Sequence, residues 1–395
     1  MRPIKQLRLY WADTWRRSLI ILVSILGVGS LFWFRLSSLT GGRSTQEVAS
    51  NYHLTFHGIL ANPVNAPYSL GLYVLQKLHH TGLLEVRSLS ALAGLTALVF
   101  FYIVLRRWYT KRMALLGIIL FGTSTWFLQT ARFASPDVLL LVLPALLICG
   151  VWLRDTERRA LATLLMVVMG SVLLYIPGLI WFVMACIIWQ NGLLRREFKE
   201  IKPIVLLAYI LLGGLLLTPL VWALVHTPSL IKPLLGLPSA WPGLRQAAQN
   251  LVSVPQYLFI RGPSNPSLWL GHLPLLDIFS SAMFFLGLYA YYLRWRINQG
   301  RLLLGILVIG SLLVALGGSV SITVLLPFVY IVMTAGVALL LQQWLTVFPR
   351  NPLAKRAGMI LVVTAVVAAS FYQLNRYFVA WPHAPATKQA FSIKN

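Results

Sequence analysis

The stretch from Arg87 to Ala131, RSLSALAGLTALVFFYIVLRRWYTKRMALLGIILFGTSTWFLQTA, decides the fold of this protein. It contains two apolar runs, at 87–105 and 113–131, and each is about as long as a helix that crosses a bilayer. The short turn between them carries four basic residues and no acidic one. Such a turn is typical of a cytoplasmic loop. The stretch therefore predicts two transmembrane helices that are joined inside the cell.

The rest of the chain repeats this pattern. The sequence is 58% hydrophobic and 11% charged, whereas a soluble domain carries about 25% charged residues. We therefore expect an all-α polytopic membrane protein, with about eleven transmembrane helices in a single domain over residues 1–395. The expected spans are 18–36, 87–105, 113–131, 136–153, 160–175, 177–192, 203–224, 273–293, 302–317, 320–343 and 357–375.

Basic residues set the orientation. Most of the Lys and Arg fall in alternate loops, which are 1–17, 106–112, 154–159, 193–202, 294–301 and 344–356. The positive-inside rule makes these loops cytoplasmic, so we expect a plasma-membrane protein with a cytoplasmic N-terminus and an extracytoplasmic C-terminus. The same rule, together with anionic lipid head groups, accounts for the net charge of +24. No nucleic-acid surface is indicated.

This topology gives the outer face two long loops, at 37–86 and 225–272, and the tail at 376–395. Loops that are larger than a connection requires usually carry function. The Pro-rich turn Asn62–Tyr68 leads into an apolar stretch at 69–78 that is too short to span. We expect it to form a helix that lies on the membrane surface.

Carboxylates are scarce, because the chain has only nine Asp and Glu residues. The topology places Glu47, Glu85, Asp137 and Asp277 on the outer side. Glu47 and Asp137 lie in polar, loop-forming sequence, so we regard both as candidate catalytic residues. Each also has a structural explanation. Ser44 to Glu47 has the spacing of a capping box, and Asp137 follows Pro136 at a helix start.

The other two outer carboxylates have structural interpretations. Asp277 is expected to be a buried acid, and Glu85 is expected to pair with Arg87 two residues later. Among the cations, Arg132 lies five residues before Asp137, where it can contact a phosphate. Arg261 is a second candidate for phosphate binding, although it can equally be an ordinary interfacial Arg.

His53, His57 and Tyr68 in the first outer loop are candidate substrate contacts. His53 and His57 have a spacing that can bind a metal if the segment is helical, but the sequence offers no third ligand. We therefore expect polar or acceptor contacts from them, and predict neither a metal nor another cofactor. Cys149 and Cys186 lie in apolar runs and are expected to be packed thiols.

Several of these segments resemble a known family. They are Ser44–Ala49 (STQEVA), Asn65–Tyr68 (NAPY), Arg87–Ser90 (RSLS), Thr130–Asp137 (TARFASPD) and the late Leu325–Phe328 (LLPF). Their arrangement resembles the polyprenyl-phosphate-dependent glycosyltransferases of the GT-C superfamily, which include the protein O-mannosyltransferases and the lipid A aminoarabinose transferases. The similarity covers about residues 18–190, and the remainder matches by layout.

The resemblance implies a lipid-linked sugar donor that enters from the bilayer, an active site on the extracytoplasmic side, and an inverting transfer to a lipid, glycan or protein acceptor. In the family a first-loop Asp–Glu pair is common, and its Asp serves as the base. Here the pair is Gln46–Glu47, so the resemblance leaves Glu47 or Asp137 as the base. Replacing Glu47 with Gln would then lower turnover by about 100- to 10,000-fold.

Two other functions remain open on the sequence alone. A transporter or flippase for a lipid-linked sugar would have pseudo-symmetric halves and broken helices at the bilayer midplane. We find no internal repeat, which favours an enzyme. A catalytically inactive scaffold of the same fold is the second alternative, because Gln46 stands where the family has an acid.

Overall fold

The computed structural model describes residues 19, 22–23, 26–27, 29–50, 54–152, 159–294 and 298–393. Six residues of the expected first span 18–36 (18, 20–21, 24–25 and 28), and His53, lie outside the described residues. Within the described residues the chain is helical, and its one strand-like pairing is an isolated bridge between Arg43 and Ile393. The helices of the first half are α2 (Thr45–Ser50), α3 (Phe56–Ala61), α4 (Ala66–Lys77), α5 (Leu83–Trp108), α6 (Lys111–Thr123), α7 (Thr125–Arg132), η1 (Pro136–Val142), α8 (Pro144–Trp152), α9 (Arg159–Leu173), α10 (Leu179–Trp189) and α11 (Asn191–Glu200).

The second half continues this all-helical pattern, and α14 lies in the second long outer loop as α4 lies in the first. Its helices are α12 (Pro203–His226), η2 (Pro228–Leu230), α13 (Ile231–Leu234), α14 (Leu244–Phe259), α15 (Ile278–Leu293), α16 (Asn298–Ala315), η3 (Ile322–Leu325), α17 (Leu326–Val347), α18 (Pro352–Asn375), η4 (Arg376–Ala380), α19 (Trp381–His383) and α20 (Pro385–Ala390). The long outer loops thus contain helices, as expected.

Apolar helices confirm a polytopic membrane protein. Within the described ranges, four helices are long and apolar enough to cross a membrane: Leu83–Trp108, Pro203–His226, Ile322–Val347 and Pro352–His383. A fifth crossing results if the bent pair α6–α7 counts as one span. Apart from the first span, the other expected spans correspond to apolar helices of 10–17 residues. These helices are shorter than the ~20 residues of a straight crossing. Length and composition therefore support four or five of the eleven expected crossings.

The expected span 113–131 is broken at Ser124, where α6 and α7 meet at 60°. Ser124 has an extended backbone, and its hydroxyl accepts a hydrogen bond from the Phe127 N–H as the N-cap of α7. Gln373 of α18 completes the break. Its side-chain oxygen accepts from the Thr125 N–H at 3.1 Å, and its carbonyl accepts from the Thr125 hydroxyl at 2.8 Å. A distant helix thus replaces hydrogen bonds that a continuous helix would make internally.

Helices α15 and α17 pack at very short range, and two glycines make this possible. A Cβ on Gly287 would lie 1.9 Å from the Val332 carbonyl oxygen, and one on Gly336 would lie 1.9 Å from the Met283 carbonyl oxygen. No other residue fits at either position, and such small-residue contacts are typical of helix pairs in membranes.

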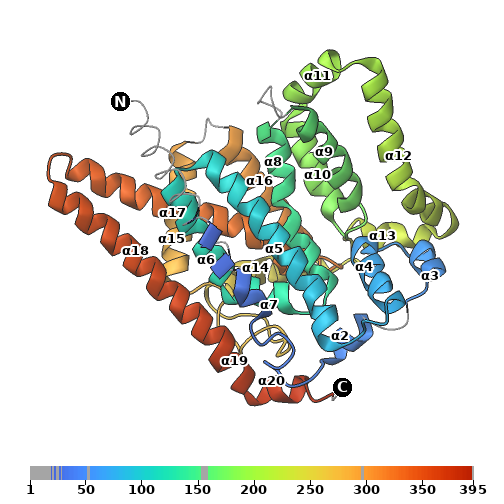
Figure 1. The fold of residues 1–395 in the computed structure, drawn as a ribbon, viewed down its shortest axis with the longest axis horizontal. Coiled ribbons are helices and arrows are strands. Elements are labelled where there is room, and N and C mark those ends of the chain that lie inside the picture. The colour runs from blue at the N-terminus through green and yellow to red at the C-terminus, as the bar shows by residue number, and fades with distance from the viewer. Residues whose placement is uncertain are drawn as a thin grey trace, which may run out of the picture.

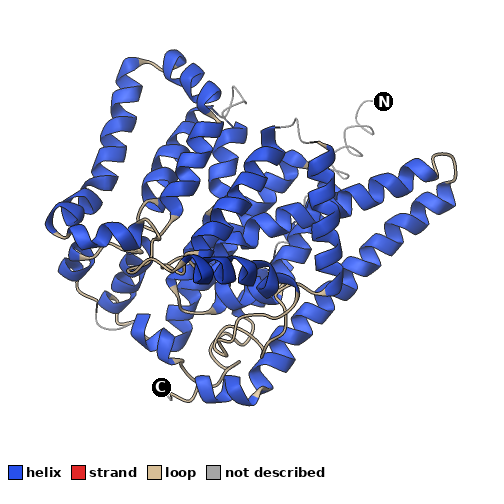
Figure 2. Ribbon diagram, turned by 180° about the vertical axis from the view of Figure 1, so that it is seen from behind, coloured by secondary structure: helices blue, strands red, loops and turns tan. Residues whose placement is uncertain are grey.

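The ribbon shows how the ends of the molecule are built (Figures 1 and 2). Helix α11 lies at one end, and α2, α19 and α20 lie at the opposite end. The last part of α17 and the first part of α18 project from the body as a hairpin. The expected outer tail folds back on the first loop. There, Trp381 and Phe391 pack with Leu39 and Phe133 in a small apolar cluster.

Candidate active site

Helix α2 holds Glu47 in the capping box that its sequence predicts. The Glu47 backbone N–H donates to the Ser44 hydroxyl at 3.2 Å, and the Glu47 carboxylate accepts from the Ser44 backbone N–H at 3.1 Å. The two residues thereby satisfy each other's polar groups at the helix start. The structure confirms the structural interpretation of Glu47, which is 0% exposed.

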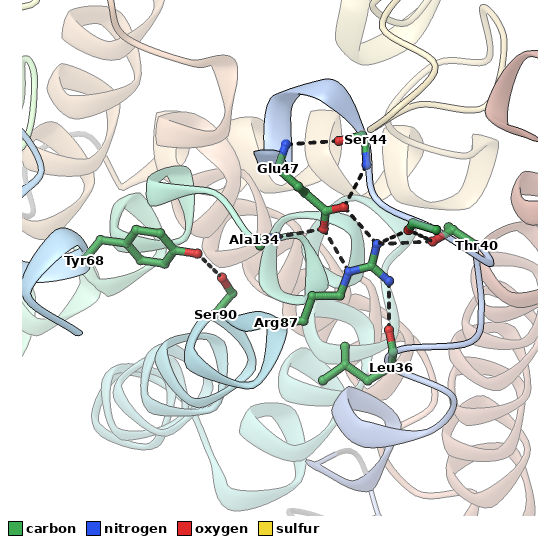
Figure 3. A network of polar contacts seen from close by, with 9 residues as sticks. Leu36, Thr40, Ser44, Glu47, Tyr68, Arg87, Ser90 and Ala134 are labelled. Atoms are coloured by element: carbon green, nitrogen blue, oxygen red, sulfur yellow. Dashed lines mark hydrogen bonds and ion pairs between the residues drawn. The ribbon is translucent and has the colours of Figure 1, made fainter. Parts of the chain in front are cut away.

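Arg87 of α5 is the main partner of the Glu47 carboxylate (Figure 3). Its Nε lies 2.8 Å from Oε1 and its Nη2 lies 2.9 Å from Oε2, so the pair is bidentate. The backbone N–H of Ala134 donates to Oε1 at 3.3 Å. A buried carboxylate with a guanidinium partner and two backbone donors is held in one orientation, because both of its oxygens are occupied.

The expected ion pair between Glu85 and Arg87 is wrong. Besides Glu47, the guanidinium of Arg87 donates to the carbonyl oxygens of Leu36 and Gly42 and to the hydroxyl of Thr40. Two residues apart on a helix, Glu85 and Arg87 point in different directions. Arg87 instead joins α5 to the chain segment that leads into α2, and thereby fixes the first outer loop on the bundle.

Arg132, the expected phosphate contact, is buried at the end of α7. It donates to the Phe34 carbonyl, and its guanidinium carbon lies 5.2 Å and 4.9 Å from the ring centres of Tyr377 and Phe378. Its Nε and Nη1 have no hydrogen-bond partner among the described residues. Arg132 lines a cavity of about 10 Å³ together with Gln129 and Arg87. This volume is that of about one water molecule.

A larger cavity, of about 500 Å³, lies beside Asp137. Asp137 occupies the first turn of η1 and is half-buried, and the Ser135 hydroxyl accepts a hydrogen bond from its backbone N–H at 3.3 Å. Ser321, just before η3, also lines this cavity. Further lining residues come from elements far apart in the chain: Gln46, Phe133, Ser135, Tyr257, Pro263, Ser264, Asn265, Leu268, Trp269, Val314 and Ile322.

The residue that joins Asp137 in this cavity from the first loop is Gln46, whereas Glu47 does not line it. Gln46 is exposed, and its side-chain oxygen accepts from the Asn265 amide at 3.3 Å. Consecutive residues of a helix point in different directions, so Gln46 lines the cavity while Glu47 points to Arg87. The two candidate catalytic residues Glu47 and Asp137 therefore do not line this cavity together, and Arg132 does not line it either.

The remaining predicted site residues lie apart from one another. Tyr68 of α4 is buried, its hydroxyl lies 3.0 Å from that of Ser90, and burial raises its pKa above the usual range (Figure 3). His57 of α3 is exposed, and His53 lies outside the described residues. Arg261 is exposed and is separated by one residue from Pro263, which lines the Asp137 cavity.

Sequence reasoning missed several lining residues, namely Asn265, Ser264, Ser321 and Gln46. The segment Arg261–Pro266 contains the predicted Arg261, but its residues that line the cavity are Pro263, Ser264 and Asn265. Ser321 carries no local signal beyond a Ser before an apolar run. For a metal, the described part of the chain brings together no three His, Cys, Asp or Glu side chains.

Comparison with known proteins identifies the fold. The chain is similar to the crystal structure of ArnT from Cupriavidus metallidurans bound to undecaprenyl phosphate, with a TM-score of 0.54. The two chains are 13% identical, and the match covers 95% of this chain and 76% of that one. No protein-family model and no curated protein matches the sequence. At this identity the match shows that the two chains share a fold.

Proposed function

We propose that this protein is a membrane glycosyltransferase that moves a sugar from a polyprenyl-phosphate carrier to an acceptor on the extracytoplasmic side. The observation that carries the proposal is the polar cavity around Asp137, in a chain with the fold of a protein crystallised with undecaprenyl phosphate. A cavity of about 500 Å³ lies in the range of small-molecule sites.

Asp137 is the proposed general base. Among the described residues it is the one carboxylate that lines the cavity, whereas the Glu47 carboxylate is occupied by Arg87. In the proposed step, the Asp137 carboxylate takes the proton of an acceptor hydroxyl or amine. The acceptor atom then forms a bond to the anomeric carbon from the face opposite the carrier, and the bond from that carbon to the phosphate oxygen breaks. The configuration inverts and the polyprenyl phosphate leaves.

The leaving phosphate needs a cation or several hydrogen-bond donors. Arg261 is the proposed cation, because it is exposed at the start of the segment that lines the cavity through Pro263, Ser264 and Asn265. Asn265 can donate an amide N–H to the same phosphate. Arg132 has a supporting role in this proposal, because it lies in the separate small cavity and anchors α7 just before Asp137.

The test is a transfer assay with the purified full-length protein in proteoliposomes. A panel of undecaprenyl-phosphate sugars serves as donors, and release of undecaprenyl phosphate is measured. Asp137→Asn should lower turnover by about 100- to 10,000-fold, since general-base assistance has that magnitude. Glu85→Gln removes a carboxylate on the same predicted side and should leave turnover unchanged.

Equal turnover in Asp137→Asn and the parent would refute the assignment of the base. A second candidate function is a catalytically inactive protein of the same fold. It is favoured by Gln46, which lines the cavity with an uncharged side chain. If the parent binds undecaprenyl phosphate but transfers none of the donor sugars, that candidate replaces the enzyme.

A further inference from the structure

A second cavity lies far from Asp137. It has a volume of about 990 Å³ and is lined by the end of α5, the start of α6, the end of α15, and parts of α17 and α18. Ile322 lines the Asp137 cavity, and Thr346 lines this one. At 1.5 Å per helical residue, Ala335 and Thr346, the first and last residues of α17 that line this cavity, lie about 20 Å and about 36 Å along the helical stretch from Ile322. The two cavities therefore lie toward opposite ends of this stretch.

The lining of this second cavity carries positive charge. Lys111, Arg112 and Arg294 line it, and none of its lining residues in the described ranges is an Asp or Glu. Arg294 donates to the Gln342 side chain at a long 3.4 Å, and Arg112 contacts the sulfur of Met359 at 3.6 Å. Within the described ranges none of the three forms a salt bridge. Three cations at one opening attract an anion, because no acidic side chain of the described lining neutralises them.

Hydrogen-bond donors accompany these cations. Helix α6 begins at Lys111, and its N-cap Thr110 makes no side-chain capping bond, so the start of this 13-residue helix retains free backbone N–H groups. Thr110 and Met113 line the cavity too. The indole N–H of Trp108, another lining residue, has no partner in the part of the chain that the structure describes. These groups suit a phosphate, which binds helix N-termini and basic side chains together.

The other wall of the cavity is apolar. Ala338, Leu339 and Leu345 of α17, and Met359 of α18, form it. These residues belong to the two helices whose ends project as a hairpin (Figure 1). The hairpin carries exposed apolar side chains along its length, including Leu340, Leu353 and Ile360, which suit contact with lipid. The cavity thus places cationic and apolar walls side by side.

We propose that this second cavity binds one anionic membrane phospholipid. Its phosphate contacts Lys111, Arg112 and Arg294, and an acyl chain lies along α17 and α18. The topology predicts that this end of the protein faces the cytoplasm, where anionic lipids are concentrated and basic pockets between transmembrane helices bind their head groups. The proposal is independent of the transfer reaction.

The test measures lipid binding by the full-length protein in detergent, through the rise in unfolding temperature on titration. The probes are phosphatidylglycerol, phosphatidylcholine and glycerol 3-phosphate. Phosphatidylglycerol should bind more tightly than phosphatidylcholine, and glycerol 3-phosphate should bind far more weakly because it has no acyl chain. The triple variant Lys111→Gln, Arg112→Gln, Arg294→Gln should weaken phosphatidylglycerol binding by about 100-fold, about fivefold for each basic side chain.

A matched control variant is Arg107→Gln, Arg350→Gln, Arg356→Gln. It removes the same charge from exposed residues at the same end of the protein, outside the cavity lining, and should retain binding. Equal losses in the two variants would show that diffuse surface charge attracts the lipid, and would overturn the proposal. Equal affinity for phosphatidylcholine, or for glycerol 3-phosphate, would overturn it as well. If the triple variant does not fold, native mass spectrometry of the parent with the two lipids makes the same comparison.

Discussion

Replacing Glu47 with Gln should destabilise the protein by about 3–5 kcal/mol, because the change leaves the buried Arg87 charge without its partner. The side chains of Glu47 and Arg87 are 0% and 4% exposed, so water cannot replace what is lost. Gln has nearly the shape of Glu. The variant therefore tests the charge and the hydrogen bonds of the carboxylate and leaves packing unchanged.

The hydrogen bonds of the Glu47 carboxylate give a second, independent value for this loss of stability. Oε1 accepts from Arg87 Nε and from the Ala134 N–H, and Oε2 accepts from Arg87 Nη2 and from the Ser44 N–H. In the Gln variant an NH2 group replaces one of the two carboxylate oxygens. This group is a donor and cannot accept, so the two hydrogen bonds to that oxygen are lost, whichever oxygen is replaced. A hydrogen bond to a charged group contributes about 1.5–3 kcal/mol, so two of them account for about 3–6 kcal/mol.

The assay is unfolding of the purified protein in detergent micelles by titration with SDS, followed by tryptophan fluorescence. A double-mutant cycle with Arg87→Gln isolates the pair, and its coupling energy should be about 3 kcal/mol. The neighbouring Gln46→Ala is the control. Because Gln46 is exposed, this change should alter the free energy of unfolding by less than about 0.5 kcal/mol.

Stability of Glu47→Gln within about 1 kcal/mol of the parent would refute the structural role derived for the pair. The same variant also separates the two interpretations of Glu47. A catalytic base would show a large loss of turnover with unchanged stability, whereas a structural ion pair loses stability and, with it, any activity.

Two further predictions concern topology and a helix start. Accessibility tags in the loops at 106–112 and 193–202 should be cytoplasmic, and tags in 225–272 and after residue 390 should be extracytoplasmic. A tag at residue 393 that lies on the same side of the membrane as a tag at residue 110 would contradict the predicted orientation. Asp277→Ala should cost about 2 kcal/mol in SDS unfolding, because Asp277 accepts from the Ser280 N–H and hydroxyl as the N-cap of α15 and from the Gln373 amide. Asp277→Asn, which keeps an acceptor for the Ser280 N–H, should cost less, and equal costs would contradict the capping role.

The amino-acid sequence by itself determined the class of the protein. Long apolar runs between basic turns must become helices, because a backbone in lipid can satisfy its hydrogen bonds only within its own segment. That requirement is local, so the positions of most helices can be predicted from the apolar runs in the sequence. The capping box at Ser44–Glu47 is local in the same way, since its two partners are three residues apart.

The tertiary structure alone decided which side chains meet. Arg87 pairs with Glu47, 40 residues away, and not with Glu85. Gln373 bonds Thr125 at the helix break from 248 residues away. Asp137 shares its cavity with Gln46 and Asn265, whereas the carboxylate next to Gln46 points to Arg87. These outcomes depend on how the helices pack. Spacing along the sequence does not give the distance between two helices in space. The partner of a side chain is therefore fixed only once the bundle is assembled.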